Sequence, residues 1–469
     1  MFDLKSKILN LKSDDGSILI FTIVIMFIFT LVLIGILGYA SMELRVTRST
    51  IYDQQAFQIA EAGANYYEWH LANFQNDFWD GNASTTPGPY VHNYADADGG
   101  QVIGKFSLAI TPPTVGSTIV TVKSTGYALA NPKEQRSVTV RYGIPSLAQY
   151  AFLTNTDAWI GSNESVSGQF MTNGGLRFDG TGNATIMSAK STYNCKSWSG
   201  SPCPHSEQGI WGSAPQSTKN FWQFPVPNVD FSAMTEDLSA LKSSAQSSGI
   251  YVTSAGSGTL LKFQSNGTIN FYAVISLHSD PSAKDVNGDT QTRSVDYQNI
   301  TSLYNKPIPA NGIIFVEGNT WVEGVVKGRA MVVAAVLPGS PSTNPNIMVQ
   351  NNLTYAAKDG TNSLGLLAQG NFLIGYNAPN NLEIDGAIIA QNGSAEIYNW
   401  ANNKNNLITI YGSTASFGQW TWTYVDDNGH CTSGYCNTGT TYDSNLLYSP
   451  PPSFPLSAAG YQQISWSSN

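Results

Sequence analysis

An uninterrupted apolar run near the start constrains this chain more than any other feature. From Gly16 to Met42 there is no charged residue, and the run from Ile18 to Ala40 is almost wholly apolar. As a helix this run is about 35 Å long, which is enough to cross a bilayer with a hydrocarbon core of about 30 Å. The sequence therefore predicts one membrane-spanning helix that carries a long chain behind it.

The composition of the chain is typical of a secreted, β-rich protein. Only 12% of residues are charged, against about 25% in ordinary globular chains. The hydrophobic content of 42% is enough to build cores, so a disordered chain is disfavoured. The net charge is −9 and basic residues are not clustered, which argues against a nucleic-acid partner.

Three interpretations of the apolar run compete. A secretory signal peptide could be cut after Ala40, but its apolar core normally has only 7–15 residues. A plain signal anchor would leave the run uncut. The basic residues around the run give a weak signal for a cytoplasmic N-terminus and an extracellular bulk, that is, for a single-pass membrane protein.

The third interpretation rests on what flanks the run. Gly16 and Ser17 directly precede it, and Ala56–Gly63 (AFQIAEAG) follows it after a charged stretch. This layout resembles that of type IV pilin-like proteins, and PilX-type minor pilins most closely. The signature residues are Ala60, Glu61, Ala62 and Gly63. The resemblance implies a subunit that inserts in the membrane and packs with other pilin-like subunits. It also implies cleavage by a prepilin peptidase after Gly16, which makes Ser17 the first mature residue.

One position departs from the pilin pattern. Counting from Ser17, the fifth residue is Phe21, where pilins usually carry a glutamate that is thought to pair with a neighbour's terminal amine. The resemblance then implies a minor subunit, at the tip of a filament or never cleaved.

The first third of the chain follows the plan of a pilin. We expect a leader at 1–16, a helix at 17–74 and a small antiparallel sheet within 75–145, with a loop from Gly81 to Gly100. Strand-like alternation occurs at Gln101–Ile110, Thr118–Ser124 and Arg136–Tyr142.

Residues 146–469 have a different sequence pattern. Short apolar runs such as Gly312–Glu317 and Met331–Val336 alternate with Gly/Asn corners, at intervals of roughly 20 residues. The fold class predicted is mainly β with a long N-terminal α-helix, the body being an irregular β-helix or solenoid; a β-sandwich is the alternative. A helical insertion near 230–247 is expected to cover an open edge, and Pro450–Pro452 to end regular structure.

The four cysteines form two local pairs in turn-rich segments. They are Cys195 with Cys203 and Cys431 with Cys436. Two loop disulfides are expected if this part lies outside the cytosol. A zinc site that adds His205 and His430 is the alternative, but the spacings are not CxxC.

A weak calcium motif lies in a polar segment. The ligands would be Asp285, Asn287, Asp289 and Asp296, at alternate and twelfth positions. The sixth position is Thr290 rather than Gly, and the twelfth is Asp rather than Glu, so an ordinary turn is the alternative. No other cofactor is expected.

Three aromatic side chains share one face of a predicted strand. Trp420, Trp422 and Tyr424 could bind a surface polysaccharide or a host or cell-surface ligand if exposed, or fill the last turn of the stack if buried.

Fragments of a polysaccharide-hydrolase set are also present. They are Asn155-Thr156-Asp157, Asp426-Asp427 and Gly429-His430. Glycosidases need two carboxylates about 5–10 Å apart, whereas these fragments are expected to lie many turns apart. The sequence thus predicts a minor pilin-like subunit for assembly, adhesion or surface interaction, and no enzyme. The alternatives are a membrane-anchored polysaccharide-active enzyme and an anchored surface protein outside any filament.

Overall fold

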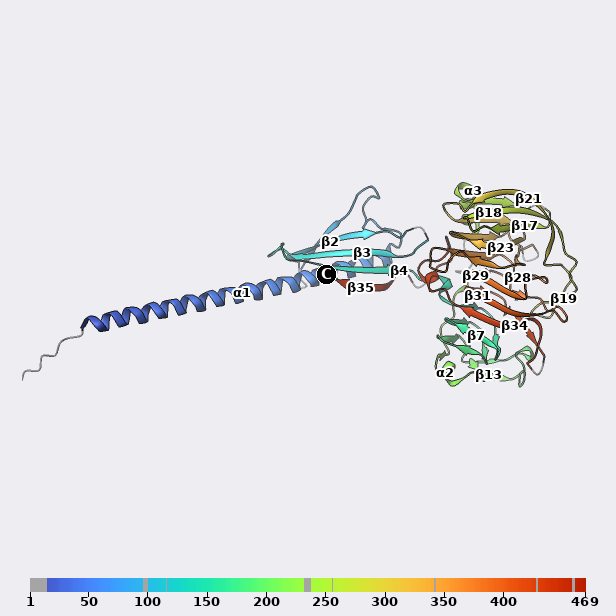
Figure 1. Cartoon of the computed structure of the whole chain (residues 1–469), viewed down its shortest axis with the longest axis horizontal. Helices are drawn as coiled ribbons and strands as arrows, with labels where there is room; N and C mark the ends of the chain where they lie inside the picture. The colour runs from blue at the N-terminus through green and yellow to red at the C-terminus, as the bar shows by residue number, and fades with distance from the viewer. Residues whose placement is uncertain are drawn as a thin grey trace, which may run out of the picture. The chain divides into compact units, whose positions relative to one another are not determined.

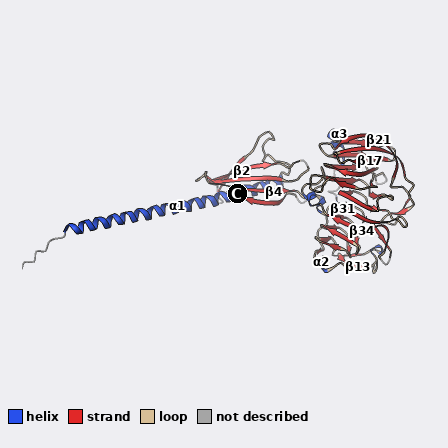
Figure 2. Cartoon of the chain, in the orientation of Figure 1, coloured by secondary structure: helices blue, strands red, loops and turns tan. Residues whose placement is uncertain are grey.

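The computed structural model describes two compact units. It covers residues 15–95, 100–114, 116–231, 238–254, 256–340, 343–426, 429–457 and 460–469. One unit combines the long helix with a small sheet, and the other contains most of residues 141–464. A long N-terminal helix followed by a mostly β body is the predicted fold class, which is confirmed (Figure 2).

Helix α1 (Asp15–Asn73) is continuous through the apolar run and the signature (Figure 1). It contains no proline, so no backbone hydrogen bond is lost within it. Its apolar side chains from Ile18 to Val46 are exposed, whereas those at Ala56, Ala60 and Leu71 are fully buried. The helix therefore has an unpacked first half and a second half that packs on the sheet.

The small sheet has five strands in the order β1-β2-β3-β4-β35. They are β1 (Tyr90–Ala95), β2 (Val102–Thr111), β3 (Val120–Ala128), β4 (Gln135–Gly143) and β35 (Gln462–Ser468). Three of these agree with the predicted strands to within four residues at each end. Two predictions were wrong: β1 lies in the segment expected to be a loop, and β35 follows the proline run that was expected to end regular structure.

The body is built from ladders of parallel strands. The longest ladder contains, in spatial order, β16 (Ile250–Thr253), β22 (Ile313–Glu317), β24 (Arg329–Ala334), β27 (Ser363–Ala368), β29 (Asn381–Ala390), β31 (Lys404–Ser416), β5 (Phe152–Thr154), β8 (Phe170–Thr172), β11 (Ile186–Ser188) and β15 (Trp222–Gln223). A second runs through β17 (Gly258–Phe263), β23 (Thr320–Val326), β25 (Ile347–Val349), β28 (Phe372–Ile374), β30 (Ala395–Ile397) and β32 (Trp420–Thr421). Parallel pairing between successive turns is what a solenoid requires, whereas a β-sandwich consists of antiparallel sheets.

A third ladder of parallel strands shares the long strands β29 and β31 with the first ladder. From β23 it passes through β26 (Leu353–Tyr355), β29, β31, β34 (Cys431–Thr441), β7 (Glu164–Ser167) and β10 (Thr181–Gly182). The turns are unequal in length, since Met331 pairs with Gly365 but Phe170 pairs with Ile186.

The turns of the body are not stacked in the order of the sequence. The chain enters in the middle at β5, proceeds to β15 at one end, and then starts again at the other end with β16. It returns through β22 to β31, which pairs with β5 through Thr414↔Phe152 and Ser416↔Thr154. In Figure 1 the turns coloured red accordingly lie between the orange and the blue-green ones.

A short helix lies where a helical insertion was predicted. Helix α3 (Leu238–Ser248) buries Leu238, Leu241 and Ala245. It packs against β16 and β22, in a core that includes Phe315. Residues 232–237 of the predicted insertion lie outside the described part of the chain.

Candidate functional site

The signature residues form the closest contact between α1 and its sheet. A Cβ on Gly63 would overlap the hydroxyl of Ser124 and the ring of Phe106. On the sheet side, a Cβ on Gly126 would overlap the backbone of Ala56 and Ala60. Small residues on both elements thus let the helix backbone approach β2 and β3 directly.

The signature also has a less buried side. Glu61 and Ala62 are half-buried, so they are not part of the deepest contact. Phe57 is also half-buried, and its ring lies 6.0 Å from that of Trp466 on β35, edge to face. The C-terminal strand therefore completes the packing around the signature, which sequence reasoning missed because nothing local in residues 462–468 indicates their partner.

A polar network joins the end of α1 to the loop before β1. Tyr66 Oη donates to Asp80 Oδ1 at 3.1 Å, and His92 Nε2 lies 2.5 Å from Asp80 Oδ2. His70 Nε2 lies 3.2 Å from Asp77 Oδ2. Burial, followed by the charge of Asp80, raises the pKa of Tyr66 to about 12, which keeps this hydroxyl a donor. The network fixes the loop to the helix.

The predicted processing residues lie at the start of α1. Gly16 and Ser17 have helical backbone directly after Asp15, the first residue of α1, and the expected leader before Asp15 lies outside the described residues. Within the described chain one helix is long and apolar enough to cross a membrane, and it is this one. The structure leaves cleavage between Gly16 and Ser17 a prediction.

Both predicted disulfides are present. Cys195 and Cys203 are bonded with their Cα atoms 5.6 Å apart, and Cys431 and Cys436 with theirs 5.4 Å apart. Over the described ranges, Cys195, Cys203 and His205 are the one group of three potential metal ligands within 4.8 Å. Because both sulfurs are in a disulfide, they are not the thiolates that zinc requires. The zinc alternative is therefore wrong.

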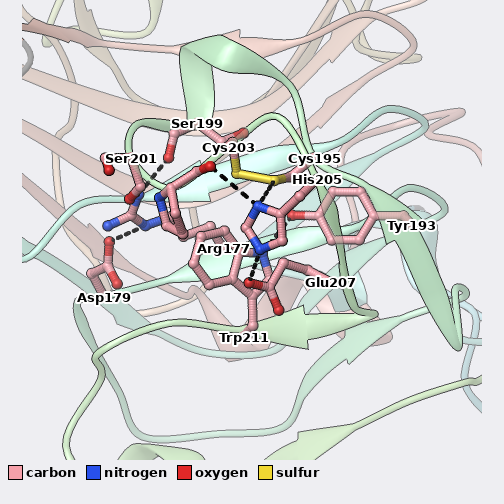
Figure 3. Close-up of a disulfide and its surroundings, with 11 residues drawn as sticks. Arg177, Asp179, Tyr193, Cys195, Ser199, Ser201, Cys203, His205, Glu207 and Trp211 are labelled. Carbon is pink, nitrogen blue, oxygen red and sulfur yellow. Dashed lines mark hydrogen bonds and ion pairs between the residues drawn. A yellow bond between two sulfur atoms is a disulfide. The ribbon is translucent and has the colours of Figure 1, made fainter.

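Arg177 lies next to the Cys195–Cys203 disulfide and binds the loop that this disulfide closes (Figure 3). The guanidinium lies 4.9 Å from the rings of both Trp159 and Trp211. Its Nε donates to Asp179 at 2.7 Å, and its Nη1 donates to the carbonyl oxygens of Ser199 and Ser201. No sequence motif indicated this cluster, because its members come from separate turns of the stack.

The structure does not assemble the predicted calcium site. Asp285 Oδ1 accepts hydrogen bonds from the backbone N–H groups of Asn287 and Asp289, both at 2.9 Å, as in an ordinary polar turn. Asp296 is fully buried and instead accepts from the backbone and side chain of Asn377. The three carboxylates of the set form no metal-binding cluster in the described chain.

The predicted aromatic surface is internal. Trp422 is 1% exposed, and Trp420 and Tyr424 pack against the same core. Trp420 lies 4.3 Å, centroid to centroid, from Phe152. The three rings therefore do not form an exposed strip. Trp420 lies on β32, the last strand of the second ladder, and it also contacts β5 through Phe152.

The fragments of a hydrolase set are closer in the stack than expected. Asn155 N donates to Ser416 O, so the turn that begins at Phe152 follows directly after the one that ends at Ser416. The expectation of many intervening turns was wrong because the stack does not follow the sequence. His430 and Asp426 pair with one another; Asp427 lies outside the described residues.

A long N-terminal helix that packs through small residues on a small sheet is the arrangement that the resemblance to pilin-like proteins predicted. Residues 15–65 match the family described as PilX N-terminal, which covers the apolar run and the signature. The predicted resemblance to PilX-type, type IV pilin-like proteins is therefore confirmed for the N-terminal segment of the chain.

The chain was also compared with solved structures and with curated proteins. A solved structure, the competence-associated pilin ComZ from Thermus thermophilus, is similar at a TM-score of 0.29 and 12% identity over 89% of this chain and 97% of that one. No curated protein matches the chain.

Proposed function

We propose that this protein is a minor subunit of a type IV pilus or related filament. In this proposal the first half of α1 inserts in the inner membrane and later packs among other pilin-like helices. The body of parallel turns is displayed outside the cell for adhesion or surface contact. The proposal includes cleavage after Gly16 by a prepilin peptidase, with the N-terminus cytoplasmic before cleavage.

The observation that carries this proposal is the division of α1 into two halves. The first half exposes apolar side chains on all sides, such as Phe21 and Met26, which are each more than 60% exposed. Such a surface is stable only in lipid or against other apolar helices. The second half packs one face on its own sheet through the signature, so the first half is the larger apolar surface left for membrane and subunit partners.

Shearing of cells that express the protein tests the filament assignment. We expect the protein in the sheared surface fraction together with the major pilin, and its loss from that fraction when the prepilin peptidase gene is deleted. Retention in the membrane fraction under both conditions would contradict the filament assignment and favour an anchored surface protein.

A further inference from the structure

The body has a polar hollow whose walls include one of the hydrolase-set fragments, Asn155-Thr156-Asp157, but no second such fragment among the described residues. Two adjoining cavities of about 340 and 450 Å³ share Asn155, Asn173 and Lys190 in their walls. The smaller one is also lined by Asp157, Lys196, Trp198 and Gln419. The walls are rich in amides and charged groups, unlike the mostly apolar sites of ordinary small-molecule ligands.

The hollow follows the corners of four successive turns. Thr154 pairs with Ser416 on one side and with Thr172 on the other, and Thr172 pairs with Ser188. The next few residues of each turn form its corner and supply Gln419, Asn155, Asn173 and Lys190 to the hollow. Four corners spaced by about 4.8 Å span roughly 14 Å, which suits a short linear ligand that runs across the turns.

Side-chain hydroxyl groups hold these corners in place. Thr154 Oγ1 donates to Gly418 O at 3.0 Å, and Thr172 Oγ1 donates to Thr156 O at 2.6 Å. Ser188 Oγ donates to Gly174 O at 2.7 Å. The floor of the hollow is thus fixed by repeated side-chain to backbone bonds rather than by flexible side chains.

The central amide is oriented in the same way. Asn173 Nδ2 donates to Asn155 Oδ1 at 2.9 Å and to Val229 O at 2.8 Å, and its Oδ1 accepts from Val229 N at 2.8 Å. Nearby, Asp157 Oδ1 accepts from Gly175 N at 2.8 Å. The amide and carboxylate groups are therefore preorganised, which lowers the cost of binding.

One wall of the hollow is a loop closed by a disulfide. The Cys195–Cys203 loop presents Lys196 and Trp198, and Trp198 is 40% exposed although it is a large aromatic residue. The disulfide closes this loop, and Arg177 binds two of its carbonyl groups (Figure 3). The indole is thus held at the rim on a rigid support.

We propose that this hollow binds a short oligosaccharide. A sugar hydroxyl both donates and accepts hydrogen bonds, and the side-chain amides of Asn155 and Gln419 offer matching donors and acceptors. Both N–H groups of Asn173 already donate within the protein, so Asn173 orients the Asn155 amide. The face of the Trp198 indole can stack on the apolar face of a sugar ring. Two lysines and two aspartates line the hollow, so its walls carry both signs of charge. The proposal rests on the proposed function only in that the body must face the cell exterior.

Binding by the purified full-length protein in detergent micelles tests this proposal. The probes are maltohexaose, chitohexaose and hexagalacturonate, and the measurement is isothermal titration calorimetry. We expect saturable binding of at least one probe, weakened about tenfold or more by Trp198→Ala or by Lys190→Ala. Both side chains are exposed, so the melting temperature should not change.

Trp69→Ala is the matched control, because this tryptophan is 57% exposed on α1 and lies outside the hollow. We expect it to bind like the wild type. Failure to bind any of the three probes, or undiminished affinity in both pocket variants, would overturn the proposal. Because the test uses isolated protein, neither result depends on cleavage at Gly16 or on filament assembly.

Discussion

Gly63 allows α1 to lie close to its sheet because glycine has no Cβ atom. Its neighbours on the sheet, Ser124 and Phe106, occupy the space that a Cβ would need. The sequence indicates this role, because Gly63 lies among the small residues Ala60, Ala62 and Ala64, which let another element approach closely. The Arg177 cluster could not be predicted, since Trp159, Arg177 and Trp211 meet only through the stacking of turns.

Gly63→Ala should destabilise the helix–sheet unit. Because the added methyl overlaps Ser124 and Phe106, we expect a loss of about 1–3 kcal/mol in unfolding free energy, measured by chemical denaturation in detergent. Gly35→Ala in the same helix is the control, since a Cβ there meets nothing within 4 Å. Equal effects of the two substitutions would contradict the close packing.

The buried carboxyl group of Glu396 should make the stability of the folded protein depend on pH. It is 2% exposed and accepts a hydrogen bond from Val286 N at 2.8 Å. Burial, the main cause, raises its pKa from 4.5 to about 8. Between these two values the folded state binds a proton that the unfolded state has lost, so stability should fall as pH rises.

Glu396→Gln should flatten this dependence, because the amide is uncharged throughout and keeps an oxygen for Val286 N. The measurement is the melting temperature from pH 5 to 8, with the exposed Glu68→Gln as control. Parallel curves for wild type and Glu396→Gln would show that Glu396 titrates normally.

At the scale of elements, α1 was the most predictable and β35 the least. Helix α1 has long apolar periodicity and no proline, and its bounds agree with the prediction to within two residues. Strand β35 joins a sheet whose other strands end at Gly143. A partner so distant in sequence leaves no local pattern.

Deletion of residues 462–469 should open the edge of β4. Ser137 and Asn469 exchange two backbone hydrogen bonds, at 3.2 and 2.9 Å, and these would be lost. We expect faster hydrogen exchange in β4 and little change in β27 or β29 of the body. Trp466→Ala, which removes the ring packed on Phe57 but keeps the strand, should cost only about 0.5–1.5 kcal/mol. Unchanged exchange in β4 after the deletion would contradict its pairing with β35.

At the scale of the whole molecule, the sequence predicted a β body of stacked turns but not their order. Apolar strands such as Phe152–Thr154 and Thr414–Ser416 pair with each other, but nothing in their sequences specifies this pairing. Only the packing of complete turns decides this, so the hydrolase fragments were placed wrongly. The N-terminal third was easier, because its signature and its apolar run lie within one continuous helix.

The mass of the native protein's N-terminal peptide tests the central claim most directly. The account predicts that protein from the membrane and sheared-surface fractions begins at Ser17, as expected for a processed pilin-like subunit. A protein that begins at Met1 would contradict the account and leave a signal-anchored surface protein. A start at Ser41 would contradict it as well, because α1 would then lack the half that inserts in the membrane.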